Sequence, residues 1–159
     1  MVRTTIVLAF LFFVFVNACN NPPGKNADNN KQTGTQQTPA DSLMENVMDG
    51  HNVGMSKMSK LSSMQNQVQH VIDSIEKLPA KTKTALTPYK TKLDGVLKDL
   101  KSAKAGMEKW MDEFNMDSAV NNMEQRIKYL TEEKFKVSKV KENILASLQK
   151  ADSLIKQKF

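Results

Sequence analysis

Thioether and imidazole side chains are the groups in this sequence best suited to bind a ligand. The chain has ten methionines, two histidines and one cysteine. Thioethers and imidazoles are soft to borderline ligands that suit Cu(I). His51, Met55 and Met58 are spaced i, i+4 and i+7, which places them on one face of a continuous helix. The full candidate cluster for an interaction or a metal is Met48, His51, Met55, Met58, Met107, Trp110 and Met111.

Three interpretations of this cluster are open, and packing in a helical core is the favoured one. Methionine fills irregular gaps between helices, and it also forms adaptable surfaces for protein partners. The third interpretation is a Cu(I) site in which Trp110 covers the bound cation. Because the sequence has no dense M-x-x-M-x-x-M tract, we commit to no metal ligand and expect no cofactor besides a covalent lipid. Met55→Leu is expected to leave Cu(I) binding unchanged.

Catalytic chemistry finds little support in the sequence. A single cysteine excludes a disulfide framework and a Cys-based zinc site. His51 and His70 would lie ~28 Å apart along a straight helix, which excludes paired catalysis within one chain. Adjacent acids such as Asp112 and Glu113 point in different directions on a helix and make no acid–base pair. We therefore expect a protein that is not an enzyme and has no catalytic residue.

The first 19 residues predict export and lipidation. Arg3 precedes an apolar run at 6–16, which is shorter than the ~20 residues of a membrane-spanning helix and is typical of a signal peptide. The run ends in Val16-Asn17-Ala18-Cys19, which resembles a bacterial lipobox. We therefore expect residues 1–18 to be a lipoprotein signal peptide and Cys19 to carry palmitate-type acyl chains.

The residues after Cys19 indicate the compartment. Asn20 stands where an Asp would retain such lipoproteins in the inner membrane of many Gram-negative bacteria, so we expect the outer membrane. No acidic cluster follows, which favours the periplasmic face over the cell surface. Residues 20–40 contain no Leu, Ile, Val or aromatic residue, so residues 19–40 are predicted to be the lipidated cysteine and a disordered tether. Export argues against a nucleic-acid partner despite a net charge of +6.

Helical spacing of apolar residues begins at residue 41. We predict helices over about 42–78, 81–115 and 118–157. The first is expected to begin at a capping box formed by Ser42 and Glu45. Its expected apolar stripe is Met44, Met48, Met55, Met58, Leu61, Met64, Val68, Val71, Ile75 and Leu78, with His51 in the missing slot. Successive spacings of three between Met55 and Met64 form a stammer, which overwinds a coiled-coil contact.

The second and third helices have their own apolar stripes. The second stripe is Leu86, Tyr89, Leu93, Val96, Leu100, Ala103, Met107, Trp110 and Phe114. Pro88 is expected to kink this helix or to mark its first turn. The third helix is expected to begin at Ser118. Its stripe is Val120, Met123, Ile127, Leu130, Val137, Ile144, Leu148, Ala151 and Ile155, widened by Phe135, Val140 and Leu154.

Three helices of matched length with short turns predict an all-α fold over 41–159. The expected architecture is an elongated antiparallel three-helix bundle, up-down-up and coiled-coil-like. That topology gathers most of the methionines at one end and brings His51, Met55 and Trp110 close together. The opposite tip is basic, with Lys77, Lys81, Lys83, Lys90 and Lys92. Such a tip suits an anionic envelope polymer, although a solvated face is the favoured interpretation.

Three short runs carry a resemblance to a known family. VMDGHNVGMSKM (47–58), WMDEF (110–114) and YLTEEK (129–134) resemble a family of short Gram-negative lipoproteins often labelled "viral A-type inclusion protein". The resemblance implies a helical lipoprotein over most of 42–157 and assigns no catalytic residue. Asn52 stands where the family usually has an acidic residue, which removes a carboxylate beside His51.

The sequence therefore predicts a non-enzymatic, membrane-anchored lipoprotein that acts as a periplasmic structural or protein-interaction module. Its expected partners are the membrane, through the lipid, and an unidentified protein. The alternative is a protein that binds or carries Cu(I) at the Met- and His-rich end of the bundle.

Overall fold

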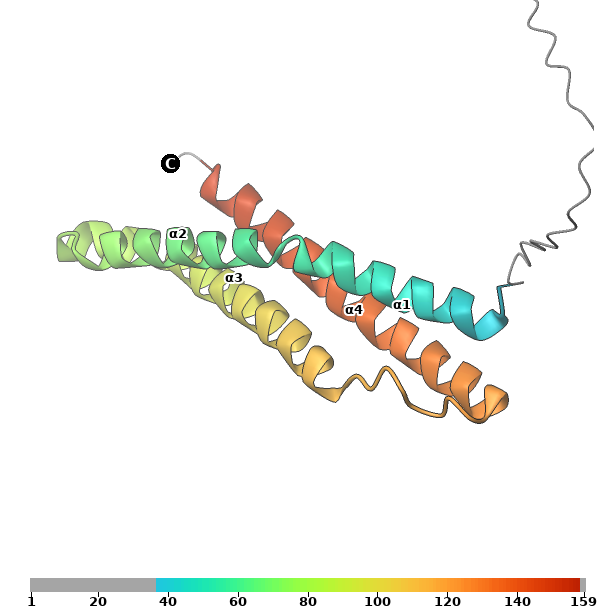
Figure 1. The fold of residues 1–159 in the computed structure, drawn as a ribbon. Coiled ribbons are helices and arrows are strands. Elements are labelled where there is room, and N and C mark those ends of the chain that lie inside the picture. Colours follow the sequence, from blue (N-terminus) through green and yellow to red (C-terminus); the bar gives the residue numbers. More distant parts are fainter. Residues whose placement is uncertain (1–36, 158–159) are drawn as a thin grey trace, which may run out of the picture. The chain divides into compact units, whose positions relative to one another are not determined.

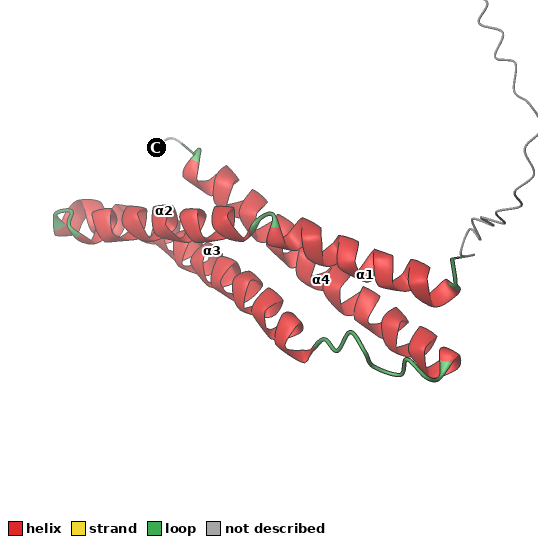
Figure 2. Ribbon diagram, viewed as in Figure 1, coloured by secondary structure: helices red, strands yellow, loops and turns green. Residues whose placement is uncertain are grey.

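The computed structural model describes residues 37–157, and this part of the chain is helical with no strand. Figures 1 and 2 show the helices α1 (Pro39–Met55), α2 (Met58–Glu76), α3 (Ala80–Glu113) and α4 (Met123–Ile155). The prediction of an all-α fold is confirmed for these residues. The expected signal peptide, Cys19 and residues 20–36 of the tether lie outside the described part. None of the described helices has a stretch both long and apolar enough to cross a membrane.

A capping box starts α1 four residues earlier than the sequence suggested. The Thr38 hydroxyl accepts a hydrogen bond from the Asp41 N–H at 3.2 Å, and the Asp41 carboxylate accepts one from the Thr38 N–H at 3.0 Å. Pro39 occupies the first helical turn, where no N–H partner is needed. The expected start at Ser42 is wrong because the Ser42 N–H already donates within the helix, to the Thr38 carbonyl at 3.1 Å.

The expected first helix is divided at Ser56 and Lys57, where two turn residues separate α1 from α2. The Ser56 hydroxyl donates to the Val53 carbonyl at 2.7 Å, which competes with continued helix hydrogen bonding. The break falls in the region of three-residue spacings, each of which is about 60° short of a full helical turn. A continuous helix would rotate its apolar stripe away from its neighbour. The break instead lets α1 pack mainly on α4 while α2 packs mainly on α3.

The side of α1 that packs on α4 is formed by small residues and not by methionines. Its buried residues are Ala40, Val47, Gly50 and Gly54. A Cβ on Gly50 would lie only 2.9 Å from Val137 Cγ1, and one on Gly54 would collide with Met107 Cε. The two glycines therefore allow a close approach that places their own face, and not the methionine face, against the core.

The expected stripe of α1 is consequently wrong by about one position around the helix. Met44, Met48 and His51 are only partly buried, and Met55 is exposed. These residues flank the Gly50–Gly54 side of the helix. The part of the stripe in α2 is confirmed at Leu61, Met64, Val68 and Ile75, which are all buried.

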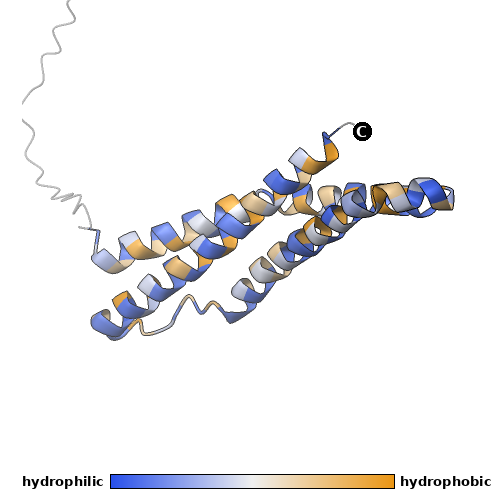
Figure 3. Cartoon of the chain, turned by 180° about the vertical axis from the view of Figure 1, so that it is seen from behind, coloured by the Kyte–Doolittle hydropathy of each residue, from blue (hydrophilic) through white to orange (hydrophobic). Residues whose placement is uncertain are grey.

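The regular stripe of α3 is confirmed. Leu93, Leu100, Ala103, Met107 and Trp110 are buried, and Leu86, Tyr89, Val96 and Phe114 pack partly buried against the same core. Leu97 is also buried, which the stripe omitted. Pro88 lies inside α3 and not in its first turn, because the helix already begins at Ala80 after Pro79. Figure 3 shows hydrophobic and hydrophilic residues recurring along each helix, as expected of elements that share one core.

The loop at 114–122 replaces the expected first turn of the third helix. Asn122 caps α4, because its side-chain oxygen accepts from the Gln125 N–H at 3.0 Å. Ser118 is therefore not the helix cap. The Arg126 guanidinium donates to the carbonyls of Met116 at 2.6 Å and Ser118 at 2.7 Å, which fixes the loop against the start of α4.

The buried side of α4 is close to the expected one, but three residues of the expected stripe are exposed. Val120 lies in the loop and Met123 begins α4, and their side chains are 58% and 53% exposed. Leu130, Val137, Ile144, Leu148, Ala151 and Leu154 are buried. Phe135 was expected to widen this stripe, but its side chain is 70% exposed. It lies two residues from both Glu133 and Val137, which are buried, and so it points to the other side of the helix.

Candidate functional site

The methionine-rich residues form a cavity where α1 faces the last turn of α3 and the loop at 114–122. The cavity has a volume of about 210 Å³ and is lined by Met48, His51, Trp110, Met111, Phe114 and Met116. We call it the methionine–aromatic cavity. Its lining combines three thioethers, one imidazole and two aromatic rings from segments far apart in the sequence.

Four rings form a continuous ladder beside this cavity. The His51 and Trp110 ring centroids are 5.7 Å apart, with the planes tilted by 39°. Trp110 stacks on Phe114 at 4.8 Å, and Phe114 stacks on Tyr129 at 6.2 Å. The Tyr129 hydroxyl also accepts a hydrogen bond from the Asn115 N–H at 2.7 Å, so the ladder ties α1, α3 and α4 to the loop.

A buried carboxylate fixes the orientation of Trp110. The indole Nε1 donates to Glu133 Oε2 at 2.9 Å, and Glu133 is only 4% exposed. The other carboxylate oxygen accepts from Lys136 Nζ at 2.7 Å. This hydrogen bond raises the pKa of Lys136 above its ordinary value, because it favours the charged ammonium. Since Glu133 holds the indole from α4, the Trp110 ring is a rigid wall of the cavity.

His51 has one ring nitrogen committed to a neighbour. Its Nδ1 lies 3.1 Å from Asn52 Oδ1, an oxygen that can only accept a hydrogen bond. Nδ1 therefore carries the proton, and the lone pair of the neutral ring is on Nε2. Asn52 thus orients the imidazole.

The structure brings together only part of the cluster expected from the sequence. Met48, His51, Trp110 and Met111 line the methionine–aromatic cavity. Met107 is fully buried in the core, with its Cε against Gly54. Met55 ends α1 and is 38% exposed, whereas Met58 begins α2 and packs against the core. Neither lines the cavity. The break at Ser56 and Lys57 removes the continuous helix face that the spacing of His51 and Met58 assumed, whereas Met55 still lies on α1, one turn beyond His51.

Three residues of the site were absent from the expected cluster. Glu133 occupies a core position between Leu130 and Val137, at spacings of three and four, and a charged residue in such a position was the signal for it. Phe114 and Met116 line the cavity from the end of α3 and the loop. The stripe of the second helix had already placed Phe114 after Trp110, whereas no sequence pattern indicated the contacts of Met116, because the loop conformation sets them.

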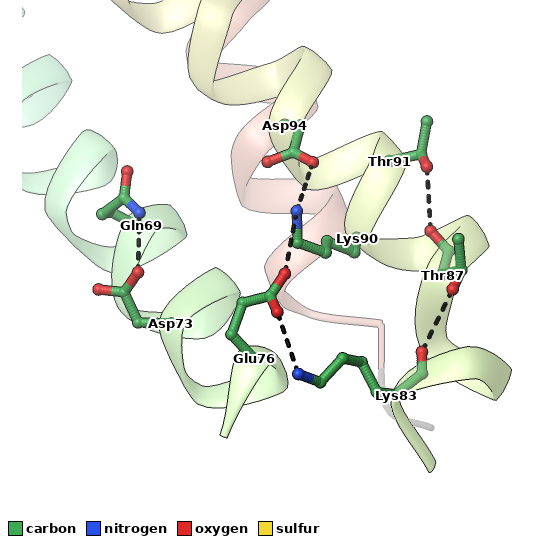
Figure 4. A network of polar contacts seen from close by, with 8 residues as sticks. All are labelled: Gln69, Asp73, Glu76, Lys83, Thr87, Lys90, Thr91 and Asp94. Carbon is green, nitrogen blue, oxygen red and sulfur yellow. Dashed lines mark hydrogen bonds and ion pairs between the residues drawn. The ribbon is translucent and has the colours of Figure 1, made fainter. Parts of the chain in front are cut away.

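The other candidate site is the basic tip. Two of its five expected lysines, Lys83 and Lys90, form ion pairs with acidic residues. Figure 4 shows Glu76 between Lys83 at 3.2 Å and Lys90 at 3.3 Å, with Asp94 3.0 Å from Lys90. Hydrogen bonds from Lys83 and then Lys90 lower the pKa of Glu76. The hydrogen bonds that Lys90 donates to Asp94, and then to Glu76, raise the pKa of Lys90. This network neutralises part of the tip, which leaves Lys77, Lys81 and Lys92 outside the ion pairs of the described residues.

Comparisons with protein families, curated proteins and solved structures give no match for this chain. Within residues 37–157, no group of three or more His, Cys, Asp or Glu side chains is arranged to hold a metal ion. The groups of the candidate site that could bind a ligand are its thioethers, its imidazole and its aromatic rings.

Proposed function

We propose that the protein is a non-enzymatic lipoprotein, anchored through Cys19 at the periplasmic face of the outer membrane, whose helical part is a structural or protein-interaction module. The Val16-Asn17-Ala18-Cys19 run and the polar residues at 20–36 support the anchor and the tether. The all-helical character of residues 37–157 supports a module that acts by its surface.

The proposal includes an antiparallel three-helix bundle in which α1 and α2 together make the first arm, α3 the second and α4 the third. For α3 and α4, two contacts support opposite directions: the Tyr89 hydroxyl to the Leu154 carbonyl at 3.3 Å and Asp99 to Lys150 at 3.0 Å. For α2 and α3, the hydrogen bond of 3.1 Å from Gln65 to the Leu100 carbonyl adds to the Glu76 network near the turn. The up-down-up order follows if α1 and α4 run in the same direction. The proximity of Gly50 to Val137 and of Gly54 to Ile144, where an added Cβ would meet those side chains, supports this direction.

The observation that carries the interaction proposal is a group of exposed apolar side chains around the loop at 114–122. Met116 is 54% exposed, Val120 58% and Met123 53%. Met111, at 36%, continues the group onto α3. We call these four residues the loop surface. Flexible thioethers adapt to the shape of a partner, and clustered apolar exposure is typical of a protein contact.

Site-specific photocrosslinking in intact cells tests the loop surface. A photoreactive residue at Val120 should give a discrete adduct with one envelope protein. The matched control is the same residue at Phe135, which is apolar and, at 70%, more exposed than Val120. Exposure alone would favour Phe135, so an adduct formed only from Val120 supports a specific surface. Equal adducts from both positions, or none from Val120, would contradict the proposal.

The anchor is tested separately by Cys19→Ser, which removes the only cysteine in the chain. The variant should leave the membrane fraction and appear in the soluble periplasmic fraction. Wild-type protein, processed in parallel, should stay with the outer membrane after a high-salt wash. A Cys19→Ser protein that still sediments with outer membranes would rule out lipid anchoring at this residue.

A further inference from the structure

We propose that the methionine–aromatic cavity is a Cu(I) site in which Met48, His51 and Met111 supply the ligands and the face of Trp110 covers the ion. The inference goes beyond the interaction module and does not depend on the anchor, and it shares only Met111 with the loop surface. It also differs from the site that the sequence spacing suggested, because Met55 and Met58 take no part.

The ligand atoms that line the cavity favour Cu(I) over other metal ions. The cavity is lined by the thioethers of Met48 and Met111 together with the imidazole of His51, and its six lining residues include no carboxylate or thiol. Soft thioether donors favour Cu(I), whereas hard divalent cations prefer carboxylate and carbonyl oxygens. Met48 and His51 are three residues apart on α1, so they share one face of that helix. Met111 reaches the same cavity from α3.

The free nitrogen of His51 suits a metal ligand. In the neutral ring, Nδ1 donates to Asn52 and Nε2 therefore carries the lone pair that a metal ion would take. Metal-binding histidines in proteins commonly use the second ring nitrogen in this way, since the hydrogen bond fixes both tautomer and ring orientation. His51 is only partly buried, which leaves a route for the ion from solvent.

The aromatic wall is held in place before any ion arrives. Trp110 is fixed by its hydrogen bond to the buried Glu133 and by stacking on Phe114 at 4.8 Å. Its ring centroid lies 5.7 Å from that of His51, so a cation bound at His51 would lie close to the indole. An indole face attracts a cation through its quadrupole. The helices place His51 and Trp110, whereas Met116, on the loop and 54% exposed, lies outside the proposed ligand set.

The test is a Cu(I) titration of the full-length protein in detergent, without oxygen, against a chromophoric chelator. Every preparation carries Cys19→Ser so that no thiol competes. Met48→Leu, Met111→Leu and His51→Gln should each weaken Cu(I) binding by about 10-fold or more, because loss of a ligand costs at least as much as loss of one of its outer-shell partners. Met55→Leu is the matched control, since Met55 also lies on α1 but does not line the cavity, and it should bind like the parent.

Trp110 provides a second readout because it is the only tryptophan in the chain. One equivalent of Cu(I), or of Ag(I) as a redox-inert substitute, should quench its fluorescence in the parent protein. Volume-conserving Met→Leu changes keep a packed site intact, which circular dichroism verifies for each variant. The proposal is overturned if the parent does not bind Cu(I), if binding leaves Trp110 fluorescence unchanged, or if Met55→Leu weakens binding as much as Met111→Leu. None of these outcomes would affect the crosslinking result expected at Val120.

Discussion

Trp110 and Glu133 are joined by a hydrogen bond of 2.9 Å between the indole N–H and a carboxylate that is 4% exposed. The pair connects the last turns of α3 with α4, and it sets the position of the indole beside His51. A buried acid in an apolar stripe is tolerable only when its oxygens are paired, as they are here with Trp110 and Lys136. The hydrogen bond to Glu133 thus fixes the Trp110 indole, which lines the methionine–aromatic cavity.

The first prediction concerns this pair. Glu133→Leu should lower the free energy of unfolding by about 1–3 kcal/mol, because it leaves the buried indole N–H without an acceptor. Glu133→Gln keeps an acceptor and should cost less. The single variants Glu133→Leu and Trp110→Phe and the double variant that combines them can be compared by denaturant unfolding. The double variant should lose less free energy of unfolding than the sum of the two single losses. Strict additivity would show that the hydrogen bond contributes nothing.

The contrast between α3 and α1 shows what the sequence can predict. In α3, large apolar residues recur at alternating spacings of three and four, so the residues that look buried are buried, from Leu93 to Trp110. In α1 the buried positions include Gly50 and Gly54, which allow close packing because they have no side chain. A hydrophobicity pattern cannot detect that, and it assigns Met48 and Met55 to the core instead.

The site was predictable where it depends on register and not where it depends on a break or loop. The hairpin register placed His51 opposite the end of α3, and the two rings of His51 and Trp110 do lie 5.7 Å apart. Met55 was expected with them, but α1 ends there and its side chain does not line the cavity. Met116 could not be placed because Arg126 and the loop backbone determine its position.

Alanine substitution should distinguish Gly50, which is needed for close helix packing, from Gly95 and Gly106, which are not. Gly50→Ala should destabilise the protein by about 1–3 kcal/mol, since the new Cβ would press on the stiff Val137 side chain. Gly95→Ala and Gly106→Ala, whose Cβ atoms would meet nothing within 4 Å, should stabilise it by up to about 1 kcal/mol each. Denaturation midpoints measure all three, and a stabilising Gly50→Ala would contradict the close approach of α1 to α4.

The stripe of α3 can be tested at its centre. Leu100 is fully buried, so Leu100→Ala should cost about 2–5 kcal/mol of unfolding free energy. Leu145 on α4 is 41% exposed and is the matched control, for which the same change should fall within about 0.5 kcal/mol. Urea denaturation followed by circular dichroism compares them. Equal costs for the two leucines would mean that the stripe does not form the core.

The start of α1 should be sensitive to acid. Hydrogen bonding by the Thr38 hydroxyl, and then by its backbone N–H, lowers the pKa of Asp41 below its ordinary value of 3.8. A lowered folded-state pKa means that Asp41 stabilises the fold above pH 3.8 and that this contribution is lost as pH falls through the folded value. Wild type should exceed Asp41→Asn in stability at pH 7, and the difference should shrink below pH 3.8. A difference independent of pH would show that the charge of Asp41 does not contribute to the cap.

The loop at 114–122 contains one backbone position that favours glycine. Ala119 has a φ of 56°, in the left-handed region, while its carbonyl accepts from the Asn122 N–H at 3.1 Å just before α4. A side chain there costs free energy that glycine avoids, although glycine also loses more backbone entropy on folding. Ala119→Gly should therefore raise the free energy of unfolding by a net ~0.5–1 kcal/mol. Ala105→Gly, at an exposed position inside α3, should instead lower it by about 1 kcal/mol. Thermal denaturation of the two variants gives shifts of opposite sign if the turn has this conformation, and a destabilising Ala119→Gly would mean that it does not.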